Sequence, residues 1–525
     1  MPLSSRSIAW LSAAVIAATI LVAYFPGLHT PFQYDDLSNV VENVTIRDLG
    51  DIGRVLSPPA DLTSTAGRPL LSLVFAIDYA FSGQNVTGYH ATNIALHVIC
   101  ALLLYAIVRA TAGWPSVGLD AHAGVIAMAT ATIWAVHPLQ TGVVTYISGR
   151  SESLMGLWYL ATLLCAIRAH RSRRAGGWTV AAVVCCALGM ASKESMVTAP
   201  FAVLLYDRAY LFNRFSEAGK ARWRLYAGLF ATLAIGIALA LQAPRSESAG
   251  FSTEISPWTY LLNQAVIIPD YLRLIAWPDY LLFAYGEARQ MTIADVGAIG
   301  LVVPALMAVA IWLWYRRPAL GFPALWVFLT LAPTSSFVPI ATEAGAARRL
   351  YLPLAGIVLL AVVTLVTIAR RTMGSGVMFR GRLRTEHVVP VAIVVIAILL
   401  TATTAAQSRE FASPEQLWRG SAEHWPSALA HRNLAAVLLQ QGRRAEAVEE
   451  LRAATERNRR RATRWVSSSS SSGGPRTRSR NYGALFRNSR LSPRSRWKAG
   501  GCWRVRCNRK DVIWRRPMCS RRSRR

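Results

Sequence analysis

The sequence predicts an all-α polytopic membrane protein with about eleven transmembrane helices, surface helices in a long first outer loop, and a C-terminal remnant of a helical repeat. Of its 525 residues, 53% are hydrophobic and only 16% are charged, against roughly 25% charged in soluble domains. Apolar stretches close to the roughly 20 residues of a bilayer-crossing helix recur up to about residue 406. Lys and Arg gather in alternate connections between these stretches. This composition excludes a water-soluble enzyme.

The membrane domain is expected over residues 1–406. Its first apolar stretch is long, and no small-residue cleavage site follows it before Pro26, so we expect an uncleaved anchor. The sixth stretch is the shortest. The eleven expected spans lie near residues 8–25, 89–109, 122–138, 152–168, 177–191, 195–207, 225–243, 292–315, 320–338, 350–369 and 388–406.

Orientation follows from the basic residues, because cytoplasmic loops retain an excess of Lys and Arg. The alternation holds only if the apolar segment 258–277 does not cross the membrane. That segment contains Asn263, Gln264, Asp270 and Arg273, which suits a surface-lying or re-entrant helix. The inner connections contain Arg6, then Arg168, Arg171, Arg173 and Arg174, then Arg208, Arg214, Lys220, Arg222 and Arg224, then Arg316 and Arg317, then Arg370, Arg371, Arg380, Arg382 and Arg384.

The outer side then receives the first outer loop, residues 26–88, and everything after residue 406. A bacterial inner membrane, with the repeat segment on the periplasmic or extracellular side, is the expected location; in a eukaryotic host the endoplasmic reticulum is the alternative. The seven cysteines form no disulfide framework and no CxxC metal spacing.

Residues 407–458 are predicted to be a linker and a single tetratricopeptide (TPR) repeat. From Ala428 the chain places small residues and leucines at the repeat's positions, so that two helices can cross closely. One repeat cannot bury its own face, because stable arrays need about three. The matching residues are Asn433, Leu434, Ala435, Leu438, Gly442, Ala447, Leu451 and Ala454.

Residues 459–525 form an Arg/Ser-rich tail. The tail holds 22 Lys and Arg but a single acid, Asp511, so most of the net charge of +29 lies there. We interpret it as a disordered segment or an out-of-frame reading of further repeats, with a natural basic tail that binds anionic lipid or nucleic acid as the alternative. No nucleic-acid partner is expected for the rest of the chain.

An acidic pair, Asp35 and Asp36, stands in the first outer loop about ten residues past the first span. Adjacent carboxylates can hold a divalent metal, or one of them can act as a general base whose proton affinity its neighbour raises. A solvated turn is the structural alternative for this pair.

Further charged and polar side chains stand at the same outer boundary. Arg68 precedes Pro69 and an apolar run too short to span, which indicates a helix on the outer surface. His90 lies on the outer part of the second span, on one face with Asn93 and His97. The other candidates are His137 after the third span, Arg150 and Glu152 before the fourth, Lys193 and Glu194 in the turn after the fifth, and Arg348 and Arg349 at the start of the tenth.

These groups are co-located by topology, although ion pairs, lipid anchors and packing histidines are the structural alternatives for each alone. Cations and carboxylates at a lipid–water boundary suit a substrate with a phosphate head and a long apolar tail. Arg and Lys can bind the phosphate and stabilise its departing charge, while a carboxylate deprotonates an attacking hydroxyl. The implied reaction is glycosyl transfer from a polyprenyl-phosphate sugar. The candidate phosphate-binding residues are Arg68, Arg150, Lys193, Arg348 and Arg349. The candidates for supporting these residues from a second layer of contacts are His90, His137, Glu152 and Glu194.

Residues 20–458 resemble the transmembrane-and-TPR proteins related to protein O-mannosyltransferases, which are glycosyltransferases of the GT-C class. The resemblance rests on YDD, GRPLLSL, GYHATNIALH, HPLQTGVVTYISGRSE, SKE, PTSSFVPI and RRLYLPLAG in the family's order. It implies a GT-C-like bundle, a catalytic base at Asp35 or Asp36, a dolichyl- or polyprenyl-phosphate sugar donor, commonly of mannose, and a TPR segment that presents a protein acceptor.

The chain departs from the family's pattern at two places. Family members often show Glu before the paired arginines, where this chain has Ala347, and Glu343 is the candidate substitute. The repeat array also stops after one recognisable unit. Two other classes of protein are the alternatives: a non-catalytic TPR scaffold for envelope assembly, which leaves the outer charges without a task, and a transporter, which would place charges along the bilayer midplane.

Overall fold

The computed structural model describes residues 5–59, 64–114, 117–242, 255–280, 282–336, 338–340, 343–374, 385–471, 504–508 and 511–515. Side chains are described except at residues 5–6, 372–389 and from 460 onwards. The predicted inner residues Arg6, Arg380, Arg382 and Arg384 therefore lie outside the described side chains, as does most of the tail.

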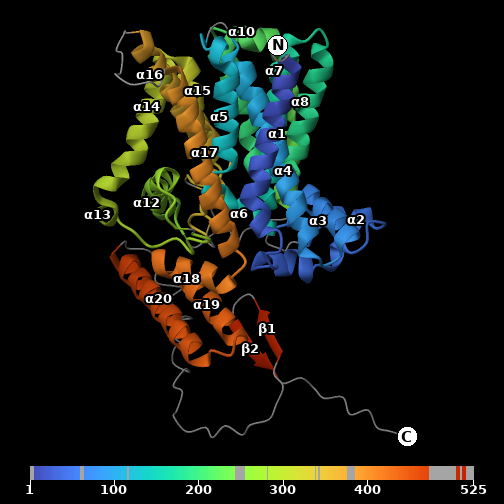
Figure 1. Ribbon diagram of the computed structural model, residues 1–525. Coiled ribbons are helices and arrows are strands. Elements are labelled where there is room, and N and C mark those ends of the chain that lie inside the picture. The colour runs from blue at the N-terminus through green and yellow to red at the C-terminus, as the bar shows by residue number, and fades with distance from the viewer. Residues whose placement is uncertain are drawn as a thin grey trace, which may run out of the picture. The chain divides into compact units, whose positions relative to one another are not determined.

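Each of the eleven predicted spans has a helical counterpart, and the long helices run side by side as one bundle (Figure 1). Six helices in the described part are long and apolar enough to cross a membrane. The all-α, multi-pass prediction is thereby confirmed, while the number eleven stays a prediction. The counterparts are α1 Ser5–Tyr24, α4 Val86–Ala112, α5 Ala123–Ala135, α7 Arg150–Arg171, α8 Ala175–Met190, α9 Ala199–Tyr210, α10 Phe215–Ala231 with α11 Leu233–Gln242, α13 Ile293–Val296 with α14 Val302–Arg316, α15 Pro318–Leu331, α16 Pro353–Gly374 and α17 Thr385–Glu410.

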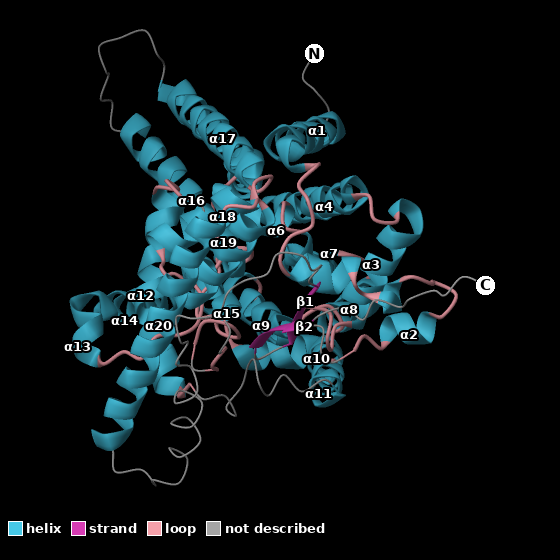
Figure 2. Cartoon of the chain, turned by 90° about the horizontal axis from the view of Figure 1, so that it is seen from below, coloured by secondary structure: helices cyan, strands magenta, loops and turns pink. Residues whose placement is uncertain are grey.

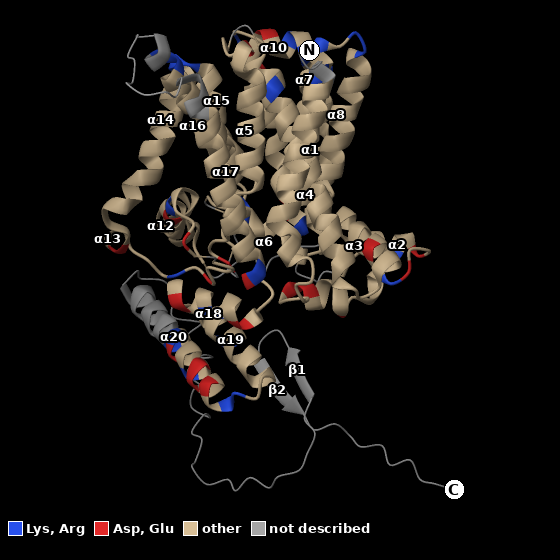
Figure 3. Ribbon diagram, viewed as in Figure 1, with Lys and Arg blue, Asp and Glu red and all other residues tan. Residues whose placement is uncertain are grey.

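The two ends of the bundle differ in charge (Figure 3). Lys and Arg gather at the end where α7 joins α8 and where α10 begins. The opposite end carries the first outer loop, with α2 Ile52–Leu56 and α3 Pro69–Ser82, together with the short helix α6 Thr141–Val144. The distribution matches the alternation expected from the sequence, with the basic connections at one end and the acidic pair at the other.

Segment 258–277 forms α12 Pro257–Ala276, which lies across the bundle while α14 and α15 stand upright (Figure 1). Its polar residues bind loop backbone in the interior. The Asn263 amide donates to the Arg289 carbonyl at 2.7 Å, and the Gln264 amide donates to the Ala344 carbonyl at 2.8 Å. The two amide NH₂ groups thus have protein acceptors, which lipid could not supply.

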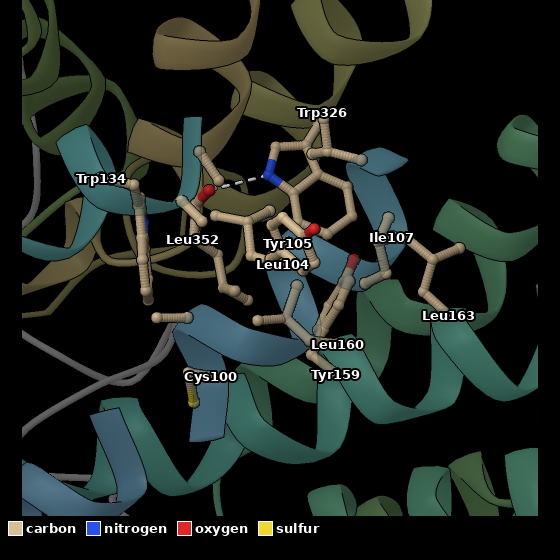
Figure 4. Packing of buried hydrophobic residues seen from close by; sticks show 14 of the residues in the cluster. Cys100, Leu104, Tyr105, Ile107, Trp134, Tyr159, Leu160, Leu163, Trp326 and Leu352 are labelled. Atoms are coloured by element: carbon tan, nitrogen blue, oxygen red, sulfur yellow. Dashed lines mark hydrogen bonds between the residues drawn. The ribbon is translucent and has the colours of Figure 1, made fainter. Parts of the chain in front are cut away.

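The main core lies among α4, α5, α7, α15 and α16, and Figure 4 shows part of it. Two tryptophans from different helices fasten the chain just before α16. The indole Nε1 of Trp326 donates to the Leu352 carbonyl at 2.8 Å, and that of Trp134 donates to the Tyr351 carbonyl at 2.8 Å. Because Arg348 and Arg349 directly precede this point, their backbone is held by the core.

The first and last membrane helices, α1 and α17, lie side by side in both views (Figures 1 and 2). The Ser408 hydroxyl on α17 donates to the Ala23 carbonyl on α1 at 3.3 Å. Close packing continues at Gly27, where an added Cβ would lie 2.8 Å from the Thr145 methyl group. The last helix therefore covers the point at which the first outer loop leaves the bundle.

Three further helices follow α17: α18 Pro414–His424, α19 Ala428–Gln440 and α20 Arg444–Ser471. Leu434, Ala435, Leu438 and Ala447 are buried together, so four of the predicted repeat positions form a helix–helix seam. Gly442 has φ +79°, the left-handed conformation that lets the chain turn between α19 and α20. The helix pair is present, and its assignment as a TPR remnant stays a prediction.

The tail forms a unit of its own, residues 465–525. Its described part contains two antiparallel strands, β1 Arg504–Asn508 and β2 Asp511–Arg515, in which Arg504 pairs with Arg515. This hairpin is the one departure from helix among the described elements, and the origin of the tail stays a prediction.

Candidate active site

Asp36 is a buried carboxylate that fastens the first outer loop to the segment before α7. One oxygen accepts from the Gln33 N–H at 3.0 Å, and the other accepts from the Ser148 N–H at 2.8 Å and the Ser148 hydroxyl at 2.6 Å. Burial raises the pKa of Asp36 to about 7, although the bonds from Ser148 lower it. Both oxygens are thus engaged by protein donors.

Asp35 has a different environment, because it is only half-buried. Burial raises the pKa of its carboxyl, the nearby Arg348 lowers it and Glu343 raises it, while the side chains of Tyr146 and Ser64 lower it. Its backbone carbonyl accepts from the Asn39 amide at 2.6 Å, which fixes the turn that follows. Of the two predicted carboxylates, Asp35 has the more exposed side chain.

The paired arginines stand in a 3₁₀ turn, Ala347–Leu350, which leads into α16. Arg348 pairs with Glu343 at 2.5 Å, and its side chain is 24% exposed. Arg349 is buried and donates to the Tyr260 hydroxyl and to the carbonyls of Thr334, Glu343 and Ala344 at 2.7–3.0 Å. Glu343 also lies 3.8 Å from Arg349. Its substitution for the acid that the family often shows at the position of Ala347 stays a prediction.

Two ion pairs connect the turn after α8 to neighbouring elements. Lys193 pairs with Glu152 at the start of α7, and both side chains are buried. Burial lowers the pKa of Lys193, and the Glu152 carboxylate raises it. Arg68, at the start of α3, binds Glu194 at 2.8 Å, and half of the Glu194 side chain is exposed.

A pocket brings two of these groups together. Glu152, Thr198, Thr334 and Arg349 all line it, with apolar side chains of α7 and α16 around them. Glu152, which pairs with Lys193, and Arg349 therefore face one space. Outside its lining, Arg348 pairs with Glu343. Burial lowers the pKa of Arg348, while the charges of Glu343, Glu152 and Asp35 raise it. We call Asp35, Glu152, Lys193, Glu343, Arg348 and Arg349 the charged layer.

Arg150 lies in a separate cluster. Its side chain is fully buried, and it pairs with Asp78 at 2.6 Å, donates to the Asn93 side-chain oxygen at 2.6 Å and donates to the Tyr89 carbonyl at 2.8 Å. Its guanidinium also lies 4.8 Å from the centre of the Phe75 ring. The geometry ties α3, α4 and α7 together, so phosphate binding by Arg150 stays a prediction that these contacts do not favour.

The two predicted histidines bind backbone carbonyls. His90 Nε2 lies 2.8 Å from the Thr30 carbonyl, and His137 Nε2 lies 3.0 Å from the Ile275 carbonyl at the end of α12. His137 also accepts from the Leu139 N–H and so caps the turn that follows α5. Both residues hold loops in place around the charged layer without joining it.

Several contributing residues were not singled out from the sequence. Asp78 is an acid inside an apolar run, which was a usable signal for a buried partner of Arg150. Tyr146 and Ser148 lie inside the motif that contains Arg150, and their roles depend on a contact with the first outer loop more than 100 residues earlier. Sequence spacing does not encode that contact.

The described residues contain no group of three His, Cys, Asp or Glu side chains placed to hold a metal. Asp36 already accepts three hydrogen bonds, so Asp35 and Asp36 do not present a preformed pair of metal ligands.

The fold and the charged layer together define a helical multi-pass membrane protein. Its polar site lies at the same end of the helical bundle as the first outer loop. Protein O-mannosyl-transferase TMTC4 of Mus musculus is 25% identical over 501 residues, which cover 83% of this chain and 65% of that protein. Protein O-mannosyl-transferase Tmtc1 of Drosophila melanogaster is 25% identical over 312 residues, 54% of this chain and 35% of that protein. Homologues of the chain are thus protein O-mannosyl-transferases, which confirms the resemblance, and the chain spans about one third to two thirds of their length.

No known family model matches the chain. Among solved structures, the oligosaccharyltransferase AglB of Archaeoglobus fulgidus, in complex with an inhibitory peptide and a dolichol-phosphate, is 12% identical with a TM-score of 0.43, over 76% of this chain and 56% of that one. ArnT of Cupriavidus metallidurans, bound to undecaprenyl phosphate, is 13% identical with a TM-score of 0.37, over 83% and 80%.

Proposed function

We propose that the protein is a GT-C-type glycosyltransferase that moves a sugar from a polyprenyl-phosphate donor to a hydroxyl group of a protein acceptor. The observation that carries the proposal is the placement of a half-buried carboxylate, Asp35, next to a layer that contains three cations. The curated relatives named as protein O-mannosyl-transferases support mannose as the sugar and protein as the acceptor.

Asp35 is the general base in this proposal. A base must be within reach of the hydroxyl and must hold the proton while the bond to the sugar forms. Burial raises the pKa of Asp35, and this increases its affinity for that proton. Asp36 instead keeps the loop in place through Gln33 and Ser148.

The leaving group is the polyprenyl phosphate. As the acceptor oxygen bonds to the anomeric carbon from one side, the bond from that carbon to the phosphate oxygen breaks on the other, and the configuration inverts. Negative charge then grows on the phosphate, where fixed cations are most effective in a site shielded from water. Arg348, the most exposed cation of the layer, is the first candidate for this role, followed by Arg349, which lines the pocket, and by Lys193, which pairs with Glu152 of the pocket.

Arg68 and Glu194 act indirectly in this proposal. Their ion pair ties the start of α3 to the turn that carries Lys193. In the proposed topology the charged layer faces away from the cytoplasm, the polyprenyl chain lies among the membrane helices, and the segment after α17 meets the acceptor on the same side.

The test is transfer of radiolabelled sugar from polyprenyl-phosphate donors by the purified protein. Asp35→Asn is expected to lower turnover by about 10²–10⁴-fold, the usual contribution of a general base. Asp48→Asn is the matched control, because Asp48 is an exposed acid of the same loop whose side chain accepts from the nearby Gly50 N–H. Undiminished transfer by Asp35→Asn would remove this residue from the chemistry, and donor binding without turnover by the unaltered protein would favour the scaffold alternative.

A further inference from the structure

Tyr34, which immediately precedes Asp35, has an unusual backbone conformation. Its φ is +49°, and it is the single non-glycine residue with positive φ in the part of the chain that the structure describes. Bulky side chains avoid this left-handed region because Cβ crowds the backbone there. Such a residue persists only where its surroundings hold it, and these positions cluster at functional sites.

Aromatic rings from two distant segments contact Tyr34, whose side chain is 39% exposed. Its ring meets that of Trp418 on α18 edge to face at 5.3 Å and that of Phe283 at 6.2 Å. Phe283 also contacts Trp418 at 5.2 Å and Tyr146 at 5.0 Å, both edge to face. Edge-to-face pairs fix the relative orientation of rings as well as burying them. We call Tyr34, Tyr146, Phe283 and Trp418 the aromatic clamp.

A second contact holds the same stretch of the first outer loop. The Gln33 side-chain amide donates to the carbonyl of Phe411, which lies between α17 and α18. Phe411 and Trp418 are both almost fully buried. The two residues before Asp35 are therefore each held by the segment that follows the last membrane helix.

The aromatic clamp also lies close to Asp35 through Tyr146. Tyr146 contacts Phe283 through its ring, and its side chain lies close to Asp35. The direction of the Asp35 side chain is thus bounded by the left-handed backbone of Tyr34 before it and by Tyr146 beside it. Both boundaries depend on Phe283, and Phe283 packs on Trp418.

We infer that α18 is part of the catalytic unit: Trp418 and Phe283 are positioning residues that keep Tyr34 in its left-handed conformation and so direct Asp35 toward Arg348. The catalytic consequence rests on the proposed sugar transfer. The segment after α17 then contributes to turnover itself, in addition to any recruitment of the acceptor.

The experiment compares Trp418→Ala with Trp418→Phe in the full-length protein in detergent. Trp425→Ala is the matched control, because Trp425 ends the same helix but packs on Tyr285 and Arg289 instead of Tyr34. Trp418→Ala is expected to lower kcat at least tenfold while the KM values for donor and acceptor stay within twofold. Trp418→Phe is expected to retain at least a third of the activity, and Trp425→Ala to match the unaltered protein.

Hydrogen exchange of the first outer loop gives a readout that needs no activity. The Asp36 N–H bonds to the Gln33 carbonyl at 2.8 Å and the Leu37 N–H to the Tyr34 carbonyl at 3.2 Å. Both amides are expected to exchange faster in Trp418→Ala, with the amides of α4 unchanged. Unchanged exchange in the loop would overturn the inference, whatever the activity.

The variant Tyr34→Gly distinguishes an effect of the aromatic clamp on the backbone of residue 34 from a general packing effect of Trp418→Ala. Glycine adopts positive φ without strain, so in a Tyr34→Gly background Trp418→Ala is expected to cost less than twofold in kcat. An equal loss in both backgrounds, or a loss confined to the KM for the acceptor, would overturn the inference. If the unaltered protein transfers no sugar, the proposed function fails, and faster loop exchange in Trp418→Ala would still support the coupling between α18 and the loop.

Discussion

Arg150 and Arg348 stand at the same end of the bundle, yet their surroundings differ. The side chain of Arg150 is fully buried and meets Asp78, Asn93 and the Tyr89 carbonyl. The side chain of Arg348 is 24% exposed and pairs with one carboxylate, Glu343. By residue type and topology the two arginines are indistinguishable in the sequence.

This difference shows that the hydrogen-bond and ion-pair partners of a cation determine whether the cation is available to a substrate. A guanidinium offers five N–H donors in a fixed plane. Where carboxylate, amide and carbonyl oxygens of the protein take them in the interior, the arginine holds helices together, and its removal leaves a buried charge without compensation. Where part of the side chain meets solvent, as in Arg348, a phosphate can still be bound.

The largest expected effect is on the buried cluster. Arg150→Met is expected to lower the free energy of unfolding by about 3–5 kcal/mol, because the Asp78 carboxylate is left buried and unpaired. Thermal unfolding in detergent measures this, and the double variant Arg150→Met with Asp78→Leu is expected to recover part of the loss. If the Arg150→Met protein is stable but no longer binds polyprenyl phosphate, Arg150 binds the phosphate as Arg348 is proposed to do, and the structural role assigned to Arg150 is wrong.

A smaller effect is expected from the titration of Asp36. Its pKa of about 7 in the folded protein lies above the ordinary 3.8, so the folded state binds more protons between these values. This contribution to stability is complete below the ordinary pKa and is lost as the pH rises through about 7. The folded state is expected to be less stable at pH 8 than at pH 5 by about 2 kcal/mol from this group, and Asp36→Ala should flatten that slope. A slope that survives the substitution would assign the titration to another group.

The smallest expected effect sharpens the role of the charged layer. Deprotonated Asp35 is the base, so transfer is expected to increase as the pH rises through its pKa. Glu343 raises that pKa and Arg348 lowers it. Glu343→Gln should therefore move the acidic limb of the pH–rate profile to lower pH, and Arg348→Gln should move it to higher pH. Shifts in the same direction would mean that Asp35 is not the titrating base.

The helical bundle was accessible from the sequence because apolar length and the placement of Lys and Arg report directly on membrane crossing. Segment 258–277 forms the predicted helix, and its surface-lying or re-entrant position in the membrane stays a prediction. Arg68 was correctly placed at the start of α3. Candidate site residues could be gathered at one end for the same reason.

The interaction partners of those residues could not be predicted from the sequence. Arg150 and Arg348 differ in their partners, and those partners come from α3, α4 and the loop before α16. The distinction between Asp35 and Asp36 depends on Ser148, which lies 112 residues away. The conformation of Tyr34 depends on Trp418, beyond the last membrane helix. Long-range packing fixes these features, and local pattern does not report on it.

The contact between α1 and α17 has a consequence for biosynthesis. The ribosome releases the first outer loop long before it makes the helix that lies against α1, and the Phe411 carbonyl that receives Gln33 comes later still. Until then the acidic stretch lies at the membrane surface without these contacts. Nascent chains that end before residue 410 are therefore expected to insert into the bilayer with this stretch open to proteases, and its protection is expected once the segment that contains Phe411 has been made.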